Sequence, residues 1–205
     1  MAQQLCIQPG QVRKEAAIQT SDCVCRFIFM KEKTAEDYMR LALKEAKKAR
    51  DIDEVPVGAI IVHQGKIIAR AHNLREKNQQ ASAHAELLAI QKASKKLGTW
   101  CLNECDLYVT LEPCMMCSGA ISLSRIHHLY YGTDDPKGGT VISRMDLKTI
   151  PHIGAYPREI TGGILKEDCA FILSDFFREK REKTKRKKTI GTGNPPEPTD
   201  DEPAE

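Results

Sequence analysis

Residues 106–131 read DLYVTLEPCMMCSGAISLSRIHHLYY, and this stretch decides which fold the chain is expected to adopt. The apolar run Asp106–Leu111 is typical of a short strand. Pro113 suits the first position of a helix, where its missing N–H costs no hydrogen bond, and we expect that helix to run to Leu123. A second strand over His128–Tyr131 follows, so the stretch predicts a strand–helix–strand unit.

The residues before this unit predict a helix and then a hairpin. A helix is expected over Thr34–Arg50, because Thr34 and Asp37 form a capping box and apolar residues follow at helical spacing. Two apolar runs, 57–63 and 66–72, flank Gln64-Gly65. This arrangement is typical of two antiparallel strands joined by a tight turn.

Further elements continue the alternation of helix and strand. We expect a helix over Ser82–Leu97 with Ser82 as its N-cap, a weak strand over Arg158–Leu165 and a long helix from Glu167 onward. An initial hairpin followed by alternating strands and helices implies a three-layer α/β/α domain with a mixed sheet.

The overall composition excludes several classes of protein. With 41% hydrophobic and 29% charged residues over 205 positions, the chain is neither fibrous nor wholly disordered. No apolar run approaches the roughly 20 residues of a spanning helix, which argues against an integral membrane protein. Met1–Gly10 lacks the order of a signal peptide, so we expect a cytoplasmic protein. In that compartment the eight cysteines favour free thiols or metal ligands over disulfides.

The formal net charge of +3 conceals two segments of opposite charge near the C-terminus. Residues 178–188 hold eight basic and two acidic residues (+6), and 189–205 hold no basic and five acidic residues (−5). We therefore expect three parts: a disordered extension or mis-assigned start over 1–30, a catalytic domain over 31–180, and a basic helix end with a disordered acidic tail over 181–205. The basic run could cover RNA phosphates or could be a solvated helix end.

Three residues in two short motifs form a candidate metal site. Cys114 and Cys117 are spaced i and i+3 at an expected helix start, where their sulfurs lie on one side and the helix dipole favours thiolates. His84, at another helix start, adds one imidazole. A Cys₂His set leaves the fourth tetrahedral position of Zn²⁺ open, which is typical of a catalytic zinc site.

Glu86 is the candidate acid–base residue of this site. It lies two residues beyond His84, where a carboxylate can move protons between a zinc-bound water and a leaving group. The order H-x-E, then P-C-x-x-C, is the signature of zinc nucleobase deaminases. Buried small thiols, a core histidine and a solvated glutamate are the alternative interpretation. A closed structural zinc site would need a further ligand, for which Cys101 and Cys105 are available but poorly spaced.

Several motifs together resemble the bacterial tRNA-specific adenosine deaminases. They are EVPVGAIIV at 54–62, Asn73, SAHAE at 82–86, LYVTLEPCMMCSGAI at 107–121, Ile164-Leu165 and LSDFFR at 173–178. The resemblance covers about residues 34–180. It implies a cytidine deaminase-like fold with a five-stranded mixed sheet, and a homodimer with one Zn²⁺ per subunit.

The resemblance also implies an activity and a set of roles. The chain is expected to convert the wobble adenosine of a tRNA anticodon stem-loop to inosine, with zinc-bound hydroxide attacking C6 and ammonia leaving. The implied roles are zinc binding by His84, Cys114 and Cys117, proton transfer by Glu86, base binding by Asn73 and the Ala85 N–H, and proximity to the RNA backbone for Asp135. For Asp135 a simple turn aspartate is an equal alternative.

Two other functions are compatible with the same motifs. A free-base deaminase acting on guanine or cytosine would share the chemistry, although the basic helix end argues mildly against it. A catalytically inactive RNA-binding or dimerisation partner would be expected to lack the proton shuttle, and Glu86 is present.

Overall fold

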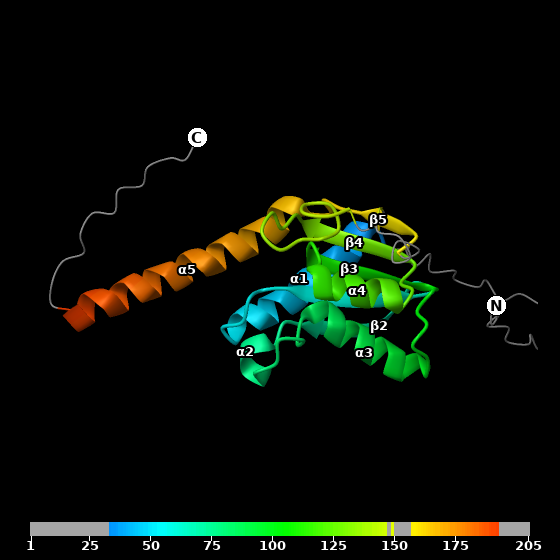
Figure 1. Ribbon diagram of the computed structural model, residues 1–205, viewed down its shortest axis with the longest axis horizontal. Coiled ribbons are helices and arrows are strands. Elements are labelled where there is room, and N and C mark those ends of the chain that lie inside the picture. The colour runs from blue at the N-terminus through cyan, green and yellow to red at the C-terminus, as the bar shows by residue number, and fades with distance from the viewer. Residues whose placement is uncertain (1–32, 147–148, 150–156, 193–205) are drawn as a thin grey trace, which may run out of the picture. The chain divides into compact units, whose positions relative to one another are not determined.

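A five-stranded mixed sheet organises the fold in the strand order β2-β1-β3-β4-β5. The computed structural model describes residues 33–146, 149 and 157–192 (Figure 1). The strands are β1 (Gly58–His63), β2 (Lys66–His72), β3 (Cys105–Leu111), β4 (His128–Thr133) and β5 (Glu159–Thr161). β1 pairs antiparallel with β2 and β3, whereas β3, β4 and β5 are parallel. The expected mixed sheet is therefore confirmed.

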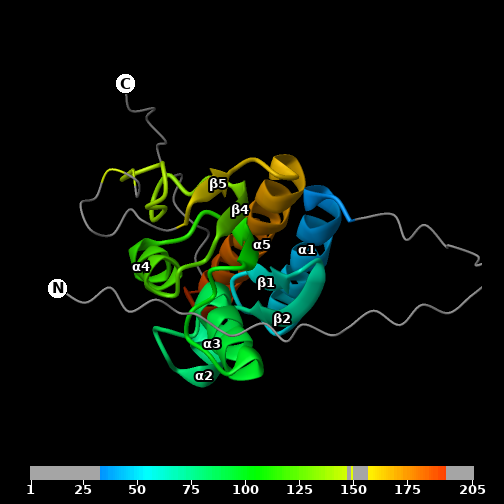
Figure 2. The same ribbon diagram turned by 90° about the vertical axis from the view of Figure 1, so that its right-hand side faces the viewer.

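Helices cover both faces of this sheet, as the three-layer prediction requires. The helices are α1 (Ala35–Asp51), α2 (Arg75–Asn78), α3 (Ala85–Leu97), α4 (Met115–Leu123) and α5 (Lys166–Thr192). Figure 2 shows α1 and α5 side by side on one face and α3 and α4 on the other. Because β3 and β4 are parallel, the connection through α4 has to cross over one face of the sheet.

The two faces of the sheet are built by alternating residues of the same strands. In β1, Ile60 and Val62 pack in a cluster with Met39 of α1, whereas Ala59 and Ile61 pack in a cluster with Ala89 of α3. Successive side chains of a strand point to opposite faces, so a central strand must be apolar on both. This requirement explains why VGAIIVH is an almost unbroken apolar run.

Gly58 allows α1 to lie directly on the start of β1. A Cβ atom at this position would stand 2.1 Å from the carbonyl oxygen of Ala42 and 2.4 Å from the amide nitrogen of Ala46. Both are backbone atoms that cannot move without displacing the helix. The close approach also fixes the path of the segment before Gly58, which runs from the end of α1 into the sheet.

Two helix starts differ from the sequence-based expectation. α3 begins at Ala85 with His84 as its N-cap, and not at Ser82. The preceding loop is held outside the helix because the N–H of Leu74 donates to the carbonyl oxygen of Ala83. α4 begins at Met115 with Cys114 as its N-cap, so Pro113 precedes the helix and is not its first residue. Cys114 is extended because it forms an isolated bridge with Gly139.

The remaining differences concern lengths and one additional helix. β5 is shorter than expected and ends at Thr161, where Gly162 and Gly163 follow and Gly163 adopts a left-handed backbone angle of +82°. The four-residue α2 was not expected from the pattern. Within the described ranges, no helix is long and apolar enough to cross a membrane. The predicted extension 1–30 and the acidic tail lie largely or wholly outside the described residues, and the domain boundaries stay predictions.

Candidate metal centre and active site

The three predicted metal ligands lie together at the N-termini of two helices. His84 is the N-cap of α3, Cys114 is the N-cap of α4, and Cys117 lies in the first turn of α4. Their donor atoms all lie within 4.8 Å of one another. The Nδ1 atom of His84 is 3.7 Å from the Sγ of Cys114 and 3.6 Å from the Sγ of Cys117.

These separations fit a small tetrahedral cation. Zinc bonds of about 2.0–2.3 Å at tetrahedral angles place neighbouring nitrogen and sulfur ligands roughly 3.5–3.8 Å apart. The observed distances from His84 fall in this range. In the described part of the chain, no second group of His, Cys, Asp or Glu residues has such a geometry. Cys101 and Cys105 are therefore not part of the cluster, and the set has three protein donors.

Hydrogen bonding within the cluster moves the pKa values of the two thiols in opposite directions. The hydrogen bond with Cys117, together with the neighbouring His84, lowers the pKa of Cys114 to about 4. The same bond and burial raise the pKa of Cys117. The pair thus shares one proton with the negative charge on Cys114, and a bound cation would favour the loss of the second proton.

Glu86 lies beside this cluster in the first turn of α3. Its side chain is buried, with 4% of the residue exposed, and it lines the same cavity as His84 and Cys114. Burial raises the pKa of its carboxyl group. A raised pKa makes the protonated form of the carboxyl group easier to reach, which a proton carrier requires.

A cavity of about 180 Å³ opens over the cluster. Asn73 and Asp135 line this cavity together with His84 and Cys114. Ala85 begins α3, and the side chain of the N-cap residue His84 makes no capping hydrogen bond to the first turn. The lining residues are Val55, Val57, Asn73, Arg75, His84, Glu86, Leu111, Glu112, Cys114 and Asp135.

Comparison with known proteins identifies the family. A family model described as MafB19-like deaminase matches residues 33–181. The chain is 52% identical over 150 residues to the tRNA-specific adenosine deaminase of Bacillus subtilis (strain 168), which covers 73% of this chain and 92% of that protein. The chain belongs to the family of tRNA-specific adenosine deaminases. The corresponding protein of Streptococcus pyogenes serotype M1 is 45% identical over 148 residues, covering 72% of this chain and 86% of that protein.

A solved structure also matches this member of the deaminase family. It comes from a study of A-to-I editing by tRNA:A34 deaminases at the wobble position of transfer RNA. The TM-score is 0.64 at 45% identity, and the match covers 66% of this chain and 98% of that chain. The expected cytidine deaminase-like fold is therefore confirmed.

The sequence left two interpretations of Asp135 open, a turn aspartate and a residue of the substrate site. Its carboxylate accepts a hydrogen bond from the N–H of Lys137 at 3.0 Å, as in a turn aspartate. The residue also lines the deaminase cavity. Asp135 is thus a turn residue that forms part of the cavity wall, and its contact with RNA stays a prediction.

Glu112 holds the loop that carries Asp135. Its buried carboxylate accepts hydrogen bonds from the N–H groups of Asp135, Val141, Ile142 and Ser143 at 2.8–3.0 Å, and from the Ser143 hydroxyl. Gly139 is required beside it, because a Cβ atom there would stand 2.3 Å from Oε2 of Glu112. Since Glu112 immediately precedes Pro113-Cys114, one side chain connects the cavity loop to the metal cluster.

Sequence reasoning missed several cavity residues. Val55 and Val57 line the cavity and lie in the EVPVGAIIV stretch, of which residues 57–62 were predicted only as part of a strand. Arg75, at the cavity rim, lies in the unexpected helix α2. A buried acidic residue in an apolar run, such as Glu54 or Glu112, was the available signal.

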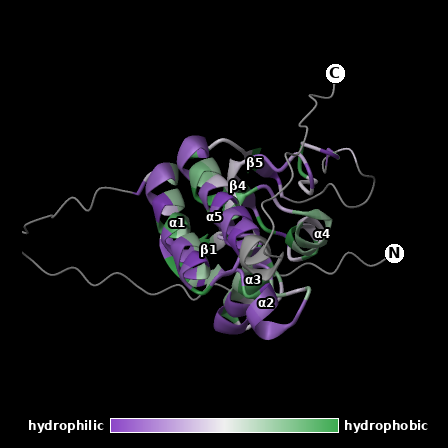
Figure 3. Ribbon diagram, turned by 90° about the vertical axis from the view of Figure 1, so that its left-hand side faces the viewer, coloured by the Kyte–Doolittle hydropathy of each residue, from purple (hydrophilic) through white to green (hydrophobic). Residues whose placement is uncertain are grey.

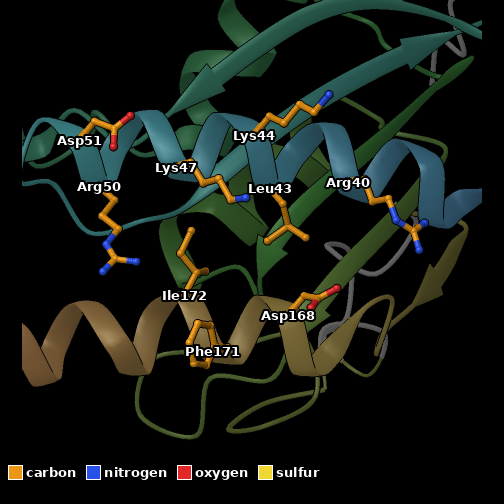
Figure 4. A pocket seen from close by; sticks show the side chains of 9 residues that line it. All are labelled: Arg40, Leu43, Lys44, Lys47, Arg50, Asp51, Asp168, Phe171 and Ile172. Atoms are coloured by element: carbon orange, nitrogen blue, oxygen red, sulfur yellow. The ribbon is translucent and has the colours of Figure 1, made fainter.

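A larger hollow lies elsewhere in the fold. A groove of about 690 Å³ between α1 and α5 is lined by basic residues of α1 and by Asp168, Phe171 and Ile172 of α5 (Figure 4). It lies over the sheet face opposite α3 and α4, and none of the predicted site residues lines it. The basic run beginning at Arg178 is also partly engaged, since Arg178 pairs with Asp175 and Lys180 with Asp53.

Replacement of Glu112 tests its role in the cavity loop. Burial alone would raise the pKa of this carboxyl group, but its hydrogen bonds with the Asp135–Ser143 loop outweigh burial and lower the pKa below the ordinary 4.5. A carboxyl group whose pKa is lower in the folded than in the unfolded protein stabilises the fold at pH values above its unfolded-state pKa. This stabilisation is lost as the pH falls through its folded-state pKa. Glu112→Gln should therefore reduce the free energy of unfolding by about 2–3 kcal/mol at pH 7.

The pH dependence provides the control for this experiment. The difference between Glu112→Gln and the wild type should shrink as the pH falls below about 4.5 in urea titrations. Glu104→Gln, which changes a carboxylate that is 68% exposed, should leave stability nearly unchanged. A pH-independent difference for Glu112→Gln would contradict the assigned role of the charge.

Proposed function

We propose that this protein is a zinc-dependent deaminase that hydrolyses adenosine to inosine at the wobble position of a tRNA anticodon. The observation that carries the proposal is the convergence of His84, Cys114 and Cys117 with the buried carboxyl group of Glu86 on one cavity. The names of the relatives support adenosine in tRNA as the substrate. A nucleoside must leave its stack to reach such an enclosed site, and an anticodon loop offers unstacked bases.

His84, Cys114 and Cys117 would hold one zinc ion per subunit. The two sulfur atoms and the imidazole nitrogen match the softness and the geometry that zinc prefers. When bound, zinc supplies a Lewis acid that makes water nucleophilic near neutral pH. The three protein donors leave one position for solvent, as in catalytic rather than structural sites.

Glu86 would carry the protons of the reaction. Hydrolysis adds the oxygen of water to C6 of adenine and releases the exocyclic amine as ammonia. The carboxylate of Glu86 would accept a proton from the attacking water and deliver it to the departing amine, so the residue ends the cycle unchanged. Burial raises the pKa of this carboxyl group, which would help it to hold the proton between the two transfers.

Asn73 and the Ala85 N–H would orient the base. Asn73 is 6% exposed and lines the cavity, and Ala85 begins α3 within the first turn that also holds Glu86. An N–H at a helix N-terminus stabilises negative charge that develops nearby. Asp135 and Arg75 at the cavity wall, with exposed basic residues of α5, are the candidate contacts to the RNA backbone.

The deaminase would act as a homodimer in the cytoplasm. Large apolar side chains are exposed on α4 and on the loop that hydrogen-bonds to its first turn. They are Met115, Met116, Leu123, Ile142 and Met145. Figure 3 shows α4 as largely hydrophobic, whereas α1 is hydrophobic on one side only. A second copy that covers this apolar surface would remove it from water.

Inosine formation tests the activity directly. Zinc-loaded protein incubated with an anticodon stem-loop that bears adenosine at the wobble position should produce inosine there, detected by mass spectrometry of the digested RNA. Glu86→Gln should keep its fold and zinc but lose about 10²–10⁴ in kcat. No inosine in any tRNA with a wobble adenosine would overturn the proposal. Ammonia release from free guanine or cytosine alone would favour a free-base deaminase.

Elemental analysis tests the metal ligands. Cys114→Ser removes one thiolate donor, so the zinc content of the purified chain should fall well below one ion per chain. Cys101→Ser is the matched control, because Cys101 lies outside the cluster, and it should keep its zinc. Full zinc occupancy in Cys114→Ser would rule out the assigned ligand set.

Analytical ultracentrifugation tests the dimer. Leu123→Asp places a charge at an exposed apolar position of α4 and should shift the protein to monomer. Phe171→Asp changes a similarly exposed apolar residue on α5, on the opposite sheet face, and should leave the dimer intact. If Leu123→Asp stays dimeric, or the wild type is a monomer, α4 is not the interface.

A further inference from the structure

Glu54 is a buried carboxylate that contacts the proposed base-binding residue. It is 1% exposed, and each of its two oxygens accepts one hydrogen bond. Oε2 accepts from Nδ2 of Asn73 at 3.0 Å, and Oε1 accepts from the N–H of Lys77 at 2.7 Å. Burying a charged group is costly unless its oxygens are satisfied, so the pair of donors explains how an acid is tolerated here.

The carboxylate dictates which way the Asn73 amide faces. An ionised carboxylate can only accept hydrogen bonds, so only the NH₂ group of Asn73 can face it. One N–H of that group is then used by Glu54. The carbonyl oxygen Oδ1 has no hydrogen-bond partner among the described residues, and it remains available to a ligand together with the second N–H. An adjacent acceptor and donor of this kind complement adenine, which presents an amine beside a ring nitrogen.

The backbone around Asn73 is fixed by the same segment. The N–H of Asn73 donates to the carbonyl oxygen of Val57 at 3.0 Å, so the Glu54–Val57 segment holds both its backbone and its side chain. The next N–H, that of Leu74, donates to Ala83, which directly precedes the metal ligand His84. The orientation of Asn73 is thus set relative to the metal cluster.

The segment that carries Glu54 is itself anchored to two helices. The N–H of Glu54 donates to the carbonyl oxygen of Ala49 in α1 at 3.0 Å. Asp53 pairs with Lys180, and Arg50 pairs with Asp175 at 2.6 Å, both from α5. Glu54 therefore lies on a rigid support, which a positioning residue needs.

We propose that Glu54 is a positioning residue that fixes the Asn73 amide with its oxygen toward the cavity and so favours adenine. That adenine is the base rests on the proposed function. That Glu54 orients Asn73 rests on the hydrogen bonds of Glu54. Through the N–H of Lys77, the same carboxylate holds α2, which carries Arg75 at the cavity rim.

The Glu54→Gln variant has a defined structural consequence. The N–H of Lys77 still requires an acceptor, so the amide oxygen of the new glutamine should face it. Its NH₂ group then faces Asn73 and requires an acceptor there. Asn73 must turn over, and it presents its NH₂ group to the cavity in place of the oxygen.

Steady-state kinetics on the full-length zinc-loaded enzyme measure this effect. Glu54→Gln should lower kcat/KM for the anticodon stem-loop by about 10- to 100-fold, the range of one or two misdirected hydrogen bonds. Zinc content should stay unchanged. In an Asn73→Ala background the same substitution should cost less than about threefold, because there is no amide to orient. Glu104→Gln removes an exposed carboxylate just before β3, and this variant should behave as wild type.

A second measurement does not depend on activity. In ¹⁵N-labelled protein, the side-chain amide signal of Asn73, assigned by its loss in Asn73→Ala, should show one proton protected from exchange with water. Glu54→Gln should shift this signal and change its protection. If the wild type produces no inosine, the proposed function fails, while the amide signal still decides the role of Glu54. An unchanged signal, or equal losses of activity in both backgrounds, would overturn the inference.

Discussion

The geometry of this protein depends on two helix N-termini that meet beyond the C-terminal ends of β2 and β3. α3 and α4 start with His84 and Cys114 as their N-caps, and neither cap is used to bond the helix backbone through its side chain. Their side chains instead lie next to each other, with Nδ1 of His84 3.7 Å from the Sγ of Cys114. The positive end of α4 favours the thiolate form of Cys114, whose pKa is lowered to about 4 mainly by its hydrogen bond with Cys117.

Buried carboxylates lie around these two helix N-termini and hold the neighbouring segments in place. Glu112 holds the loop with Asp135, Glu54 holds Asn73, and Glu86 lies in α3 beside the cluster. Glu112 and Glu54 accept hydrogen bonds from segments distant in sequence, which fixes loops that would otherwise have few contacts. These hydrogen bonds hold the cavity wall in place, although most of its residues lie in connections between elements. This rigidity suits a site that must orient a base before chemistry begins.

The sequence predicted which helices and strands form better than it predicted where they begin and end. The alternation of apolar runs and helical spacing was sufficient for the strands and long helices, since these patterns follow from the geometry of each element alone. The predictions at Ser82 and Pro113 were wrong because contacts with Leu74 and Gly139 hold these loops outside the helices. Such contacts have no local signature. β5 was predicted too long, because two glycines that end a strand can equally lie within one.

The residue types and spacings by themselves determined the alternation of strands and helices, and they predicted the metal-ligand set and the proton carrier. Two thiols at i and i+3 and a histidine are a zinc donor set, and a glutamate two residues after the histidine is typical of the proton carrier in zinc deaminases. The tertiary structure decided which other residues surround that set. Glu54 contacts Asn73, 19 positions away in sequence, and Glu112 contacts Ser143, 31 positions away. The strand order brings these segments together at one end of the strands. Hydrogen bonds between distant segments depend on that order, and no local pattern encodes it.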